Sequence, residues 1–216
     1  MNSPSAEQRL QQLHNRAFAL AIFTIIYNII EGLISTYLGY EDETLVLFGF
    51  GLDSYIEAIS GLGIAHMILR IKRNQNVARD DFERTALRIT GSAFYGLTIV
   101  LAAMAINNIV IGHVPATTFW GVVISCISIL VMIGLMRAKN TVGRELGSDA
   151  IMADARCTMI CIYMSIVLLA ASAIYELTHI AYVDALGTAG LAYFSFTEGK
   201  ECFEKAKSDA LCGCEH

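Results

Sequence analysis

The sequence predicts an all-α integral membrane protein with six transmembrane helices and both termini in the cytoplasm. Hydrophobic residues make up 55% of the 216 residues and charged residues only 16%, against about 25% charged residues in soluble domains. The apolar residues fall in runs long enough to cross a bilayer, and lysines and arginines are confined to alternate connections between those runs. Since hydrocarbon offers backbone groups no hydrogen-bond partner, each run is expected to form a helix.

The composition also excludes several classes of protein. A net charge of -5 argues against a nucleic-acid binder, which needs a concentrated basic surface, so we expect no nucleic-acid partner. The abundance of aliphatic residues excludes a disordered chain. The six cysteines lie mostly in apolar or cytoplasm-like sequence, which makes a secreted disulfide framework the weaker interpretation. The polar first sixteen residues lack the basic region and apolar core of a cleavable signal peptide.

The first apolar run covers about residues 17–40 and follows a polar segment, residues 1–15, which we expect in the cytoplasm. Glu31 is the only charged residue of this run. At about 1.5 Å of helix per residue, a run of this length crosses the roughly 30 Å of hydrocarbon. The second run covers about residues 45–69 and carries two carboxylates near its middle.

The third and fourth spans come from one long uncharged stretch. Residues 89–136 contain no Asp, Glu, Lys or Arg and are too long for a single crossing. The segment Asn107–Pro115 contains asparagines, a glycine and a proline, which favour a turn. The stretch therefore predicts spans at about residues 89–110 and 117–136.

The fifth span is predicted at about residues 149–175, where the sequence carries no charge from residue 157 onward. The sixth span is predicted at about residues 181–199. It is the least apolar of the six because it contains Asp184 and Glu198.

The placement of basic residues predicts the orientation. The connections around residues 41–43, 113 and 176–179 contain no lysine or arginine. The other segments outside the predicted spans carry Arg9, Arg16, Arg70, Lys72, Arg73, Arg79, Arg84, Arg88, Arg137, Lys139, Arg144, Lys200, Lys205 and Lys207. The positive-inside rule then places both termini in the cytoplasm and requires an even number of spans. The transmembrane domain is thus predicted over residues 16–200, followed by a short cysteine-containing cytoplasmic tail, residues 201–216.

Two pairs of ligand-type side chains stand out inside the predicted spans. Asp53 and Glu57 are four residues apart and so share one face of a helix. Two ionised acids at this spacing would repel each other, so a cation or protons are expected beside them. Cys157 and Cys161 repeat the spacing in the fifth span. Buried cysteine often acts only as a small hydrophobic residue, and buried acids can be neutral or paired, so packing roles remain open alternatives.

The helical rise predicts that the two pairs meet near the middle of the membrane. Asp53 lies about 12 Å and Glu57 about 18 Å below the outer end of the second span. Cys157 lies about 10 Å and Cys161 about 16 Å above the inner end of the fifth, which places Cys161 level with Asp53. Two carboxylates and two thiolates suit zinc or cadmium, and suit magnesium or calcium poorly. The predicted metal ligands are Asp53, Glu57, Cys157 and Cys161.

Four segments carry a resemblance to a known family. They are YNIIEG in the first span, GLDSYIEAISG in the second, SDAIMADARCT at the start of the fifth and VDALGTAGLAYFSFTEGKECFEKA in the sixth. Together, over nearly all of residues 14–207, they resemble the membrane domain of the cation diffusion facilitators. The resemblance implies a six-span divalent-metal/proton antiporter that acts as a homodimer in a prokaryotic inner (plasma) membrane. It also implies alternating access by rocking of spans one, two, four and five.

The family's transport site has an acid or histidine followed four residues later by aspartate on span two, and His-x-x-x-Asp on span five. Asp53 and Glu57 fall on the first pair. Alignment on Ala153-Asp154 places Cys157 and Cys161 on the second pair, where both depart from the usual residue types. The family's cytoplasmic C-terminal domain has no counterpart after the sixth span, so the resemblance implies a truncated branch.

Other polar residues have simpler interpretations beside a functional one. Glu31, with Asn28 one turn earlier, either assists the ion path or makes structural hydrogen bonds. Asp154 near a helix N-terminus is favoured by the helix dipole, and Arg156 can pair with it. The tail residues Cys202, Cys212, Cys214 and His216 either capture metal on the cytoplasmic side or belong to a disordered end.

The expected function is export of zinc-like divalent cations in exchange for protons, with the metal as cargo, no cofactor and no enzymatic activity. ATP drive is not expected because the phosphate-binding sequence GxxxxGK[ST] is absent. One alternative is a membrane thiol-disulfide oxidoreductase that uses Cys157 and Cys161, and another is a non-transporting membrane scaffold. The predicted partners are divalent metal ions, protons, the lipid bilayer and a second copy of the chain, with Gly91 and Gly96 of span three permitting a close helix contact.

Overall fold

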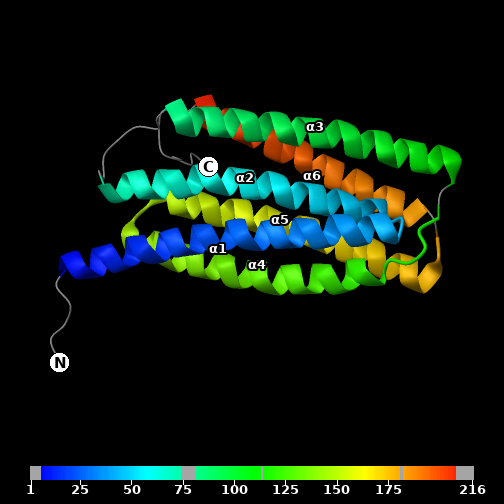
Figure 1. The fold of residues 1–216 in the computed structure, drawn as a ribbon, viewed down its shortest axis with the longest axis horizontal. Coiled ribbons are helices and arrows are strands. Elements are labelled where there is room, and N and C mark those ends of the chain that lie inside the picture. The colour runs from blue at the N-terminus through cyan, green and yellow to red at the C-terminus, as the bar shows by residue number, and fades with distance from the viewer. Residues whose placement is uncertain (1–5, 74–80, 113, 181, 208–216) are drawn as a thin grey trace.

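The computed structural model describes residues 6–73, 81–112, 114–180 and 182–207 (Figure 1). Regular secondary structure in these ranges is helical. In chain order the helices are α1 (Ala6–Glu41), α2 (Leu45–Arg73), α3 (Asp81–Ile111), α4 (Phe119–Leu146), α5 (Asp149–Thr178) and α6 (Tyr182–Lys207). The predicted all-α class is confirmed.

The helices form an elongated antiparallel bundle (Figure 1). Among the described residues, the tightest neighbours are α1 with α2, α3 with α6, and α4 with α5. Helices α2 and α5 lie in the middle of the bundle, and both also contact α6. The start of α1 and the end of α6 lie at the same end of the bundle.

Five helices in the described part of the chain, α1 to α5, are long and apolar enough to cross a membrane. Their outward faces carry large apolar side chains, including Ile99 and Leu130, which are 71% and 73% exposed. Such extensive exposed apolar surface is unfavourable in water and suits contact with lipid. The structure is therefore that of a multi-pass α-helical membrane protein.

Glycine lets α1 and α2 approach closely. A Cβ atom at Gly51 would lie 2.6 Å from the backbone nitrogen of Thr36, and one at Gly39 would lie 2.5 Å from that of Phe48. Any larger residue would force the two backbones apart. Small residues at such contacts are typical of helices that pack within membranes.

Several helices extend beyond the predicted membrane spans. Helix α1 begins at Ala6, so most of the segment expected to precede the first span is helical. Helix α4 continues past residue 136 to Leu146, where Gly147 ends it in the left-handed conformation with φ of 58°. Polar helix-forming residues extend a helix into water at little cost, so apolar runs mark the hydrocarbon segment rather than the helix end. Residues 201–207, expected in the tail, likewise belong to α6.

At the opposite end of the bundle from the start of α1, carboxylates from neighbouring helices cap two helix N-termini. The Asp184 carboxylate accepts hydrogen bonds from the backbone N–H groups of Leu45 at 3.1 Å and Val46 at 3.2 Å. Glu176 accepts from the backbone N–H and the hydroxyl of Thr118. The first N–H groups of a helix lack partners within it and attract negative charge. Asp184 thus has a structural role that explains an acid in the sixth helix.

Candidate metal centre

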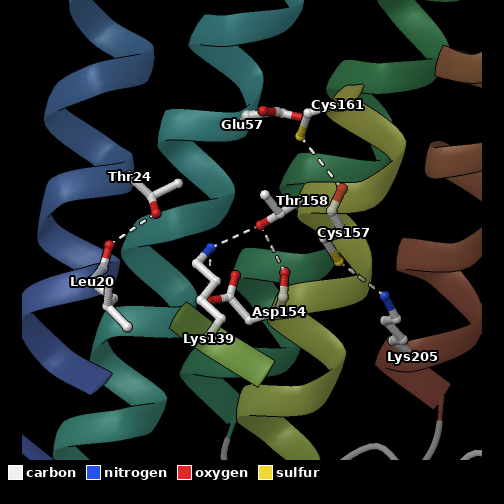
Figure 2. A network of polar contacts seen from close by, with 9 residues as sticks. All are labelled: Leu20, Thr24, Glu57, Lys139, Asp154, Cys157, Thr158, Cys161 and Lys205. Carbon is white, nitrogen blue, oxygen red and sulfur yellow. Dashed lines mark hydrogen bonds and ion pairs between the residues drawn. The ribbon is translucent and has the colours of Figure 1, made fainter. Parts of the chain in front are cut away.

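Glu57 of α2 and Cys161 of α5 meet at the packed interface between their helices (Figure 2). The Cys161 thiol donates a hydrogen bond to Glu57 Oε1. The sulfur also lies 3.4 Å from the carbonyl oxygen of Cys157, one turn earlier in α5. The structure therefore brings a carboxylate and a thiol of the predicted set into direct contact.

The Cys161–Glu57 contact differs from the one predicted from the helical rise. That prediction placed Cys161 level with Asp53, whereas the observed partner is Glu57, one helical turn further along α2. One turn is a shift of about 5.4 Å along the axis. The estimate assumed that both helices start level with the membrane faces and run straight across, whereas packed helices tilt and slide to fit their side chains.

Three of the four predicted ligands border one cavity of about 80 Å³. These are Glu57, Cys157 and Cys161. All six described helices contribute to the lining. Its other polar lining residues are Thr24, Asn28, Ser60, Thr90, Lys139, Asp154, Thr158, Glu198, Cys202 and Lys205. A cavity of this size, with these polar groups on its wall, has room for a cation with water, because a water molecule occupies about 30 Å³ in the liquid.

Asp53 lies elsewhere. It is 2% exposed, does not belong to the cavity lining, and its Oδ1 atom has no hydrogen-bond partner. The side chain remains within electrostatic range of Glu57 and Glu31. Asp53 is therefore a buried acid behind the cavity wall in this conformation, and it does not meet the cysteines as predicted.

The predicted four-ligand cluster is not assembled. Among the residues that the structure describes, no three His, Cys, Asp or Glu side chains are grouped closely enough to hold a metal ion. Each of the two sulfurs has another partner. Cys161 bonds to Glu57, and Cys157 accepts a hydrogen bond of 3.3 Å from the Lys205 ammonium. The tail residues Cys212, Cys214 and His216 lie outside the described residues.

A buried ion pair lies nearer the start of α5 (Figure 2). Lys139 Nζ of α4 is 3.0 Å from the carboxylate of Asp154 and donates to the Thr158 hydroxyl at 2.9 Å. Thr158 in turn donates to the backbone carbonyl of Asp154. Lys139, expected in the loop between the fourth and fifth spans, lies instead within α4, which continues through it and buries its side chain. Arg156, the expected partner of Asp154, is exposed.

Helix α6 supplies lining residues that the sequence prediction missed. Glu198, Cys202 and Lys205 all border the cavity. Their spacing of four and then three residues places them on one helical face. That spacing is visible in the sequence, although a predicted helix end at residue 199 separated Cys202 and Lys205 from Glu198.

Asn28 and Glu31 on α1 have different environments. Glu31 accepts hydrogen bonds from the Tyr27 hydroxyl at 2.8 Å and from Ser54 at 3.2 Å, which ties α1 to α2. Asn28 borders the cavity, is 1% exposed, and neither polar atom of its side-chain amide has a hydrogen-bond partner. The structural interpretation of Glu31 agrees with these contacts, whereas Asn28 has donor and acceptor capacity directed to the cavity.

The sequence matches no known protein-family model and no curated protein.

Proposed function

We propose that this protein exports soft divalent cations, zinc or cadmium, in exchange for protons. All six helices would cross the membrane, with both termini in the cytoplasm. Helix α6 is the least apolar, and the interior roles of Asp184 and Glu198 account for its two acids within the predicted span. The arrangement of α1, α2, α4 and α5 around the α2–α5 contact fits the moving bundle that the resemblance to cation diffusion facilitators implies.

The observation that carries the proposal is the hydrogen bond from the Cys161 thiol to Glu57, two residues that border a cavity between apolar helices. A thiol that donates to a carboxylate is a protonated pair. A divalent cation that binds both groups must displace the thiol proton, because the thiolate is the metal-ligating form. Binding of metal and release of a proton are then the same event at one place.

Charge accounting supports exchange rather than simple entry of metal. A bare dication inside hydrocarbon is costly, and its charge is offset when it meets ionised ligands. One carboxylate and one thiolate neutralise a dication, so the metal-bound site has no net charge. The site that holds protons instead of metal has a net charge of zero or minus one. The two states therefore differ by at most one unit of charge. Asp53 of α2 and Asn28 of α1 are both buried, and they are the candidates to complete the coordination when the bundle rocks.

The proposal includes a homodimer through membrane helices. Of the two glycines expected at a contact on the third span, Gly91 packs against Phe203 and Cys202 of α6, whereas Gly96 faces outward with nothing near its missing side chain. The contact face of α3 would therefore centre on Gly96 and the exposed Ile99.

Thiol-disulfide exchange is the competing function. The two sulfurs have separate partners on separate helices, Glu57 of α2 and Lys205 of α6. Thiol titration of the purified protein with and without zinc separates the two functions. Protection of Cys157 and Cys161 by zinc supports transport, whereas ready formation of a disulfide between them supports redox chemistry.

Flux into proteoliposomes under a pH gradient tests the proposal. We expect cadmium and zinc uptake that depends on the gradient, weaker manganese uptake, and loss of cadmium uptake in Glu57→Gln and Cys161→Ser. Cys126→Ser is the matched control, because Cys126 is an exposed thiol outside the cavity lining. Cadmium flux in Glu57→Gln and Cys161→Ser equal to that of the parent would contradict the proposal.

A further inference from the structure

The six helices pack as two groups. Helices α3 and α6 pack tightly against each other and contact the other four mainly through α2 and α5 (Figure 1). Helices α1, α2, α4 and α5 contact one another and form the second group. The interface between the groups therefore has α2 and α5 on one side and α3 and α6 on the other, and its two halves differ in content.

The half of this interface toward the start of α1 and the end of α6 contains the cavity. Glu57 and Cys161 border the cavity from α2 and α5, and Glu198 and Lys205 border it from α6. Lys205 belongs to the last turn of α6, and its side chain is 21% exposed. The cavity wall thus extends from the Glu57–Cys161 pair near the middle of the bundle to the end that holds the termini of the helices.

Apolar side chains fill the other half of the interface. Phe50 of α2 and Leu168 of α5 belong to one core cluster with Leu101 of α3 and Leu191 of α6, and each is at most 2% exposed. We call this cluster the apolar seal. On α5 it includes residues from 164 to 171, about 10 Å of helix length. A close-packed apolar layer of this depth excludes water and is costly for an ion to cross.

Asp184 of α6 joins the two groups at the far edge of the apolar seal. Its carboxylate, 1% exposed, accepts hydrogen bonds from the backbone N–H groups of Leu45 at 3.1 Å and Val46 at 3.2 Å, at the start of α2. Three residues later, Gly187 permits a close approach, because a Cβ atom there would lie 2.6 Å from Ala171 Cβ on α5 and 3.0 Å from Val46 Cγ2. The two groups are therefore in direct contact at this end.

Resting on the proposed function, we propose that the apolar seal is the outer gate of the exporter and that Asp184 holds it closed. The structure then corresponds to the state in which metal enters from the cytoplasm and reaches the Glu57–Cys161 pair. Release to the outside requires the Asp184 carboxylate to leave the start of α2, so that α3 and α6 separate from α2 and α5 along the seal. Asp184 acts as a positioning residue and does not touch the metal.

Thiol labelling tests the gate without metal. In a protein with its six natural cysteines replaced by serine, Leu191→Cys places a thiol in the seal. A membrane-impermeant reagent added outside should label it slowly, and Asp184→Ala should raise the rate about 10-fold, the scale expected from loss of one buried contact. Glu176→Ala is the matched control, because Glu176 caps the start of α4 within the α1, α2, α4 and α5 group. Equal labelling in the parent and Asp184→Ala, or equal increases in Asp184→Ala and Glu176→Ala, overturns the role of Asp184.

A disulfide across the seal tests whether export requires it to open. A Cβ atom at Gly187 would lie 3.4 Å from Val46 Cβ, close to the roughly 3.5–4.5 Å found in disulfides. Gly187→Cys with Val46→Cys, combined with Ala171→Gly to make room, should lose cadmium flux into proteoliposomes after oxidation with diamide and regain it after reduction. The oxidised protein should still bind cadmium in nanodiscs. Diamide-treated parent and the matching variant with serine at both positions are the controls, and both should retain flux.

The gate and the proposed function fail in different ways. Parental cadmium flux in the oxidised, cross-linked variant overturns the gate and leaves the exporter standing. Absence of metal flux in the parent and in the reduced variant overturns the exporter. The labelling rates of Leu191→Cys then still decide whether Asp184 holds the seal closed, because they depend on no metal.

Discussion

The ammonium group of Lys139 lies 3.0 Å from the carboxylate of Asp154, and the two side chains are only 2% and 12% exposed. This pair joins α4 to α5, and both residues border the cavity that holds Glu57, Cys157 and Cys161. The Thr158 hydroxyl, which accepts from Lys139, completes the contact. Because the same two side chains hold α4 against α5 and border the cavity, a change in this ion pair should alter both the packing of the two helices and the cavity wall.

Lys139→Met should therefore destabilise the protein strongly. Removal of one partner of a buried ion pair leaves an uncompensated charge, at a cost of about 3–5 kcal/mol. Thermal or denaturant unfolding in detergent measures the loss. The double variant Lys139→Met with Asp154→Asn should recover most of it. Lys200→Met, which breaks an exposed pair with Glu204, should cost about 1 kcal/mol or less. Equal effects of Lys139→Met and Lys200→Met would show that the buried pair contributes little.

Asp184→Ala should loosen the start of α2. The substitution removes the acceptor for the Leu45 and Val46 N–H groups and for the Asn108 side-chain amide. Loss of a buried acceptor costs about 1–3 kcal/mol. Hydrogen exchange of the α2 amides should rise in this variant, whereas Asp184→Asn, which keeps an acceptor suited to capping, should retain part of the protection. If the α2 amides of Asp184→Ala exchange at the same rate as those of the parent protein, Asp184 does not cap the helix.

Labelling of single cysteines in a cysteine-depleted background tests the proposed topology. Cysteines at positions 42 and 177 should react with a membrane-impermeant reagent added outside the cell. Position 144, in the last turn of α4, should react only after permeabilisation. The reason is the positive-inside bias of the connections. If position 42 reacts only from the cytoplasmic side, the proposed topology is wrong.

Replacement of both Cys157 and Cys161 by serine should abolish transport of soft metals with little effect on folding, because the volume change is small. Cys157→His with Cys161→Asp, which restores the residue types usual in the family it resembles, should keep zinc transport and weaken the preference for cadmium over zinc, since thiolate is the softer ligand. Isothermal titration and liposome flux with zinc, cadmium and manganese measure the change. If the double serine variant transports cadmium as fast as the parent protein, the two cysteines are packing residues and not metal ligands.

Much of the fold follows from local sequence. The apolar runs determine the helices and their order, because a helix in hydrocarbon needs only its own backbone to satisfy its hydrogen bonds. The spacing of Glu57 with Asp53, and of Cys161 with Cys157, determines which residues share a helical face. The confinement of basic residues to alternate connections predicts the orientation by the same kind of local reasoning.

Only the tertiary structure decided which of these faces meet. Cys161 contacts Glu57 rather than Asp53, Lys139 is buried against Asp154, and α6 brings Glu198, Cys202 and Lys205 to the cavity. Each of these results depends on the axial shift and rotation of one helix against another. Side-chain packing between residues far apart in the chain sets both quantities, and helical periodicity carries no information about either.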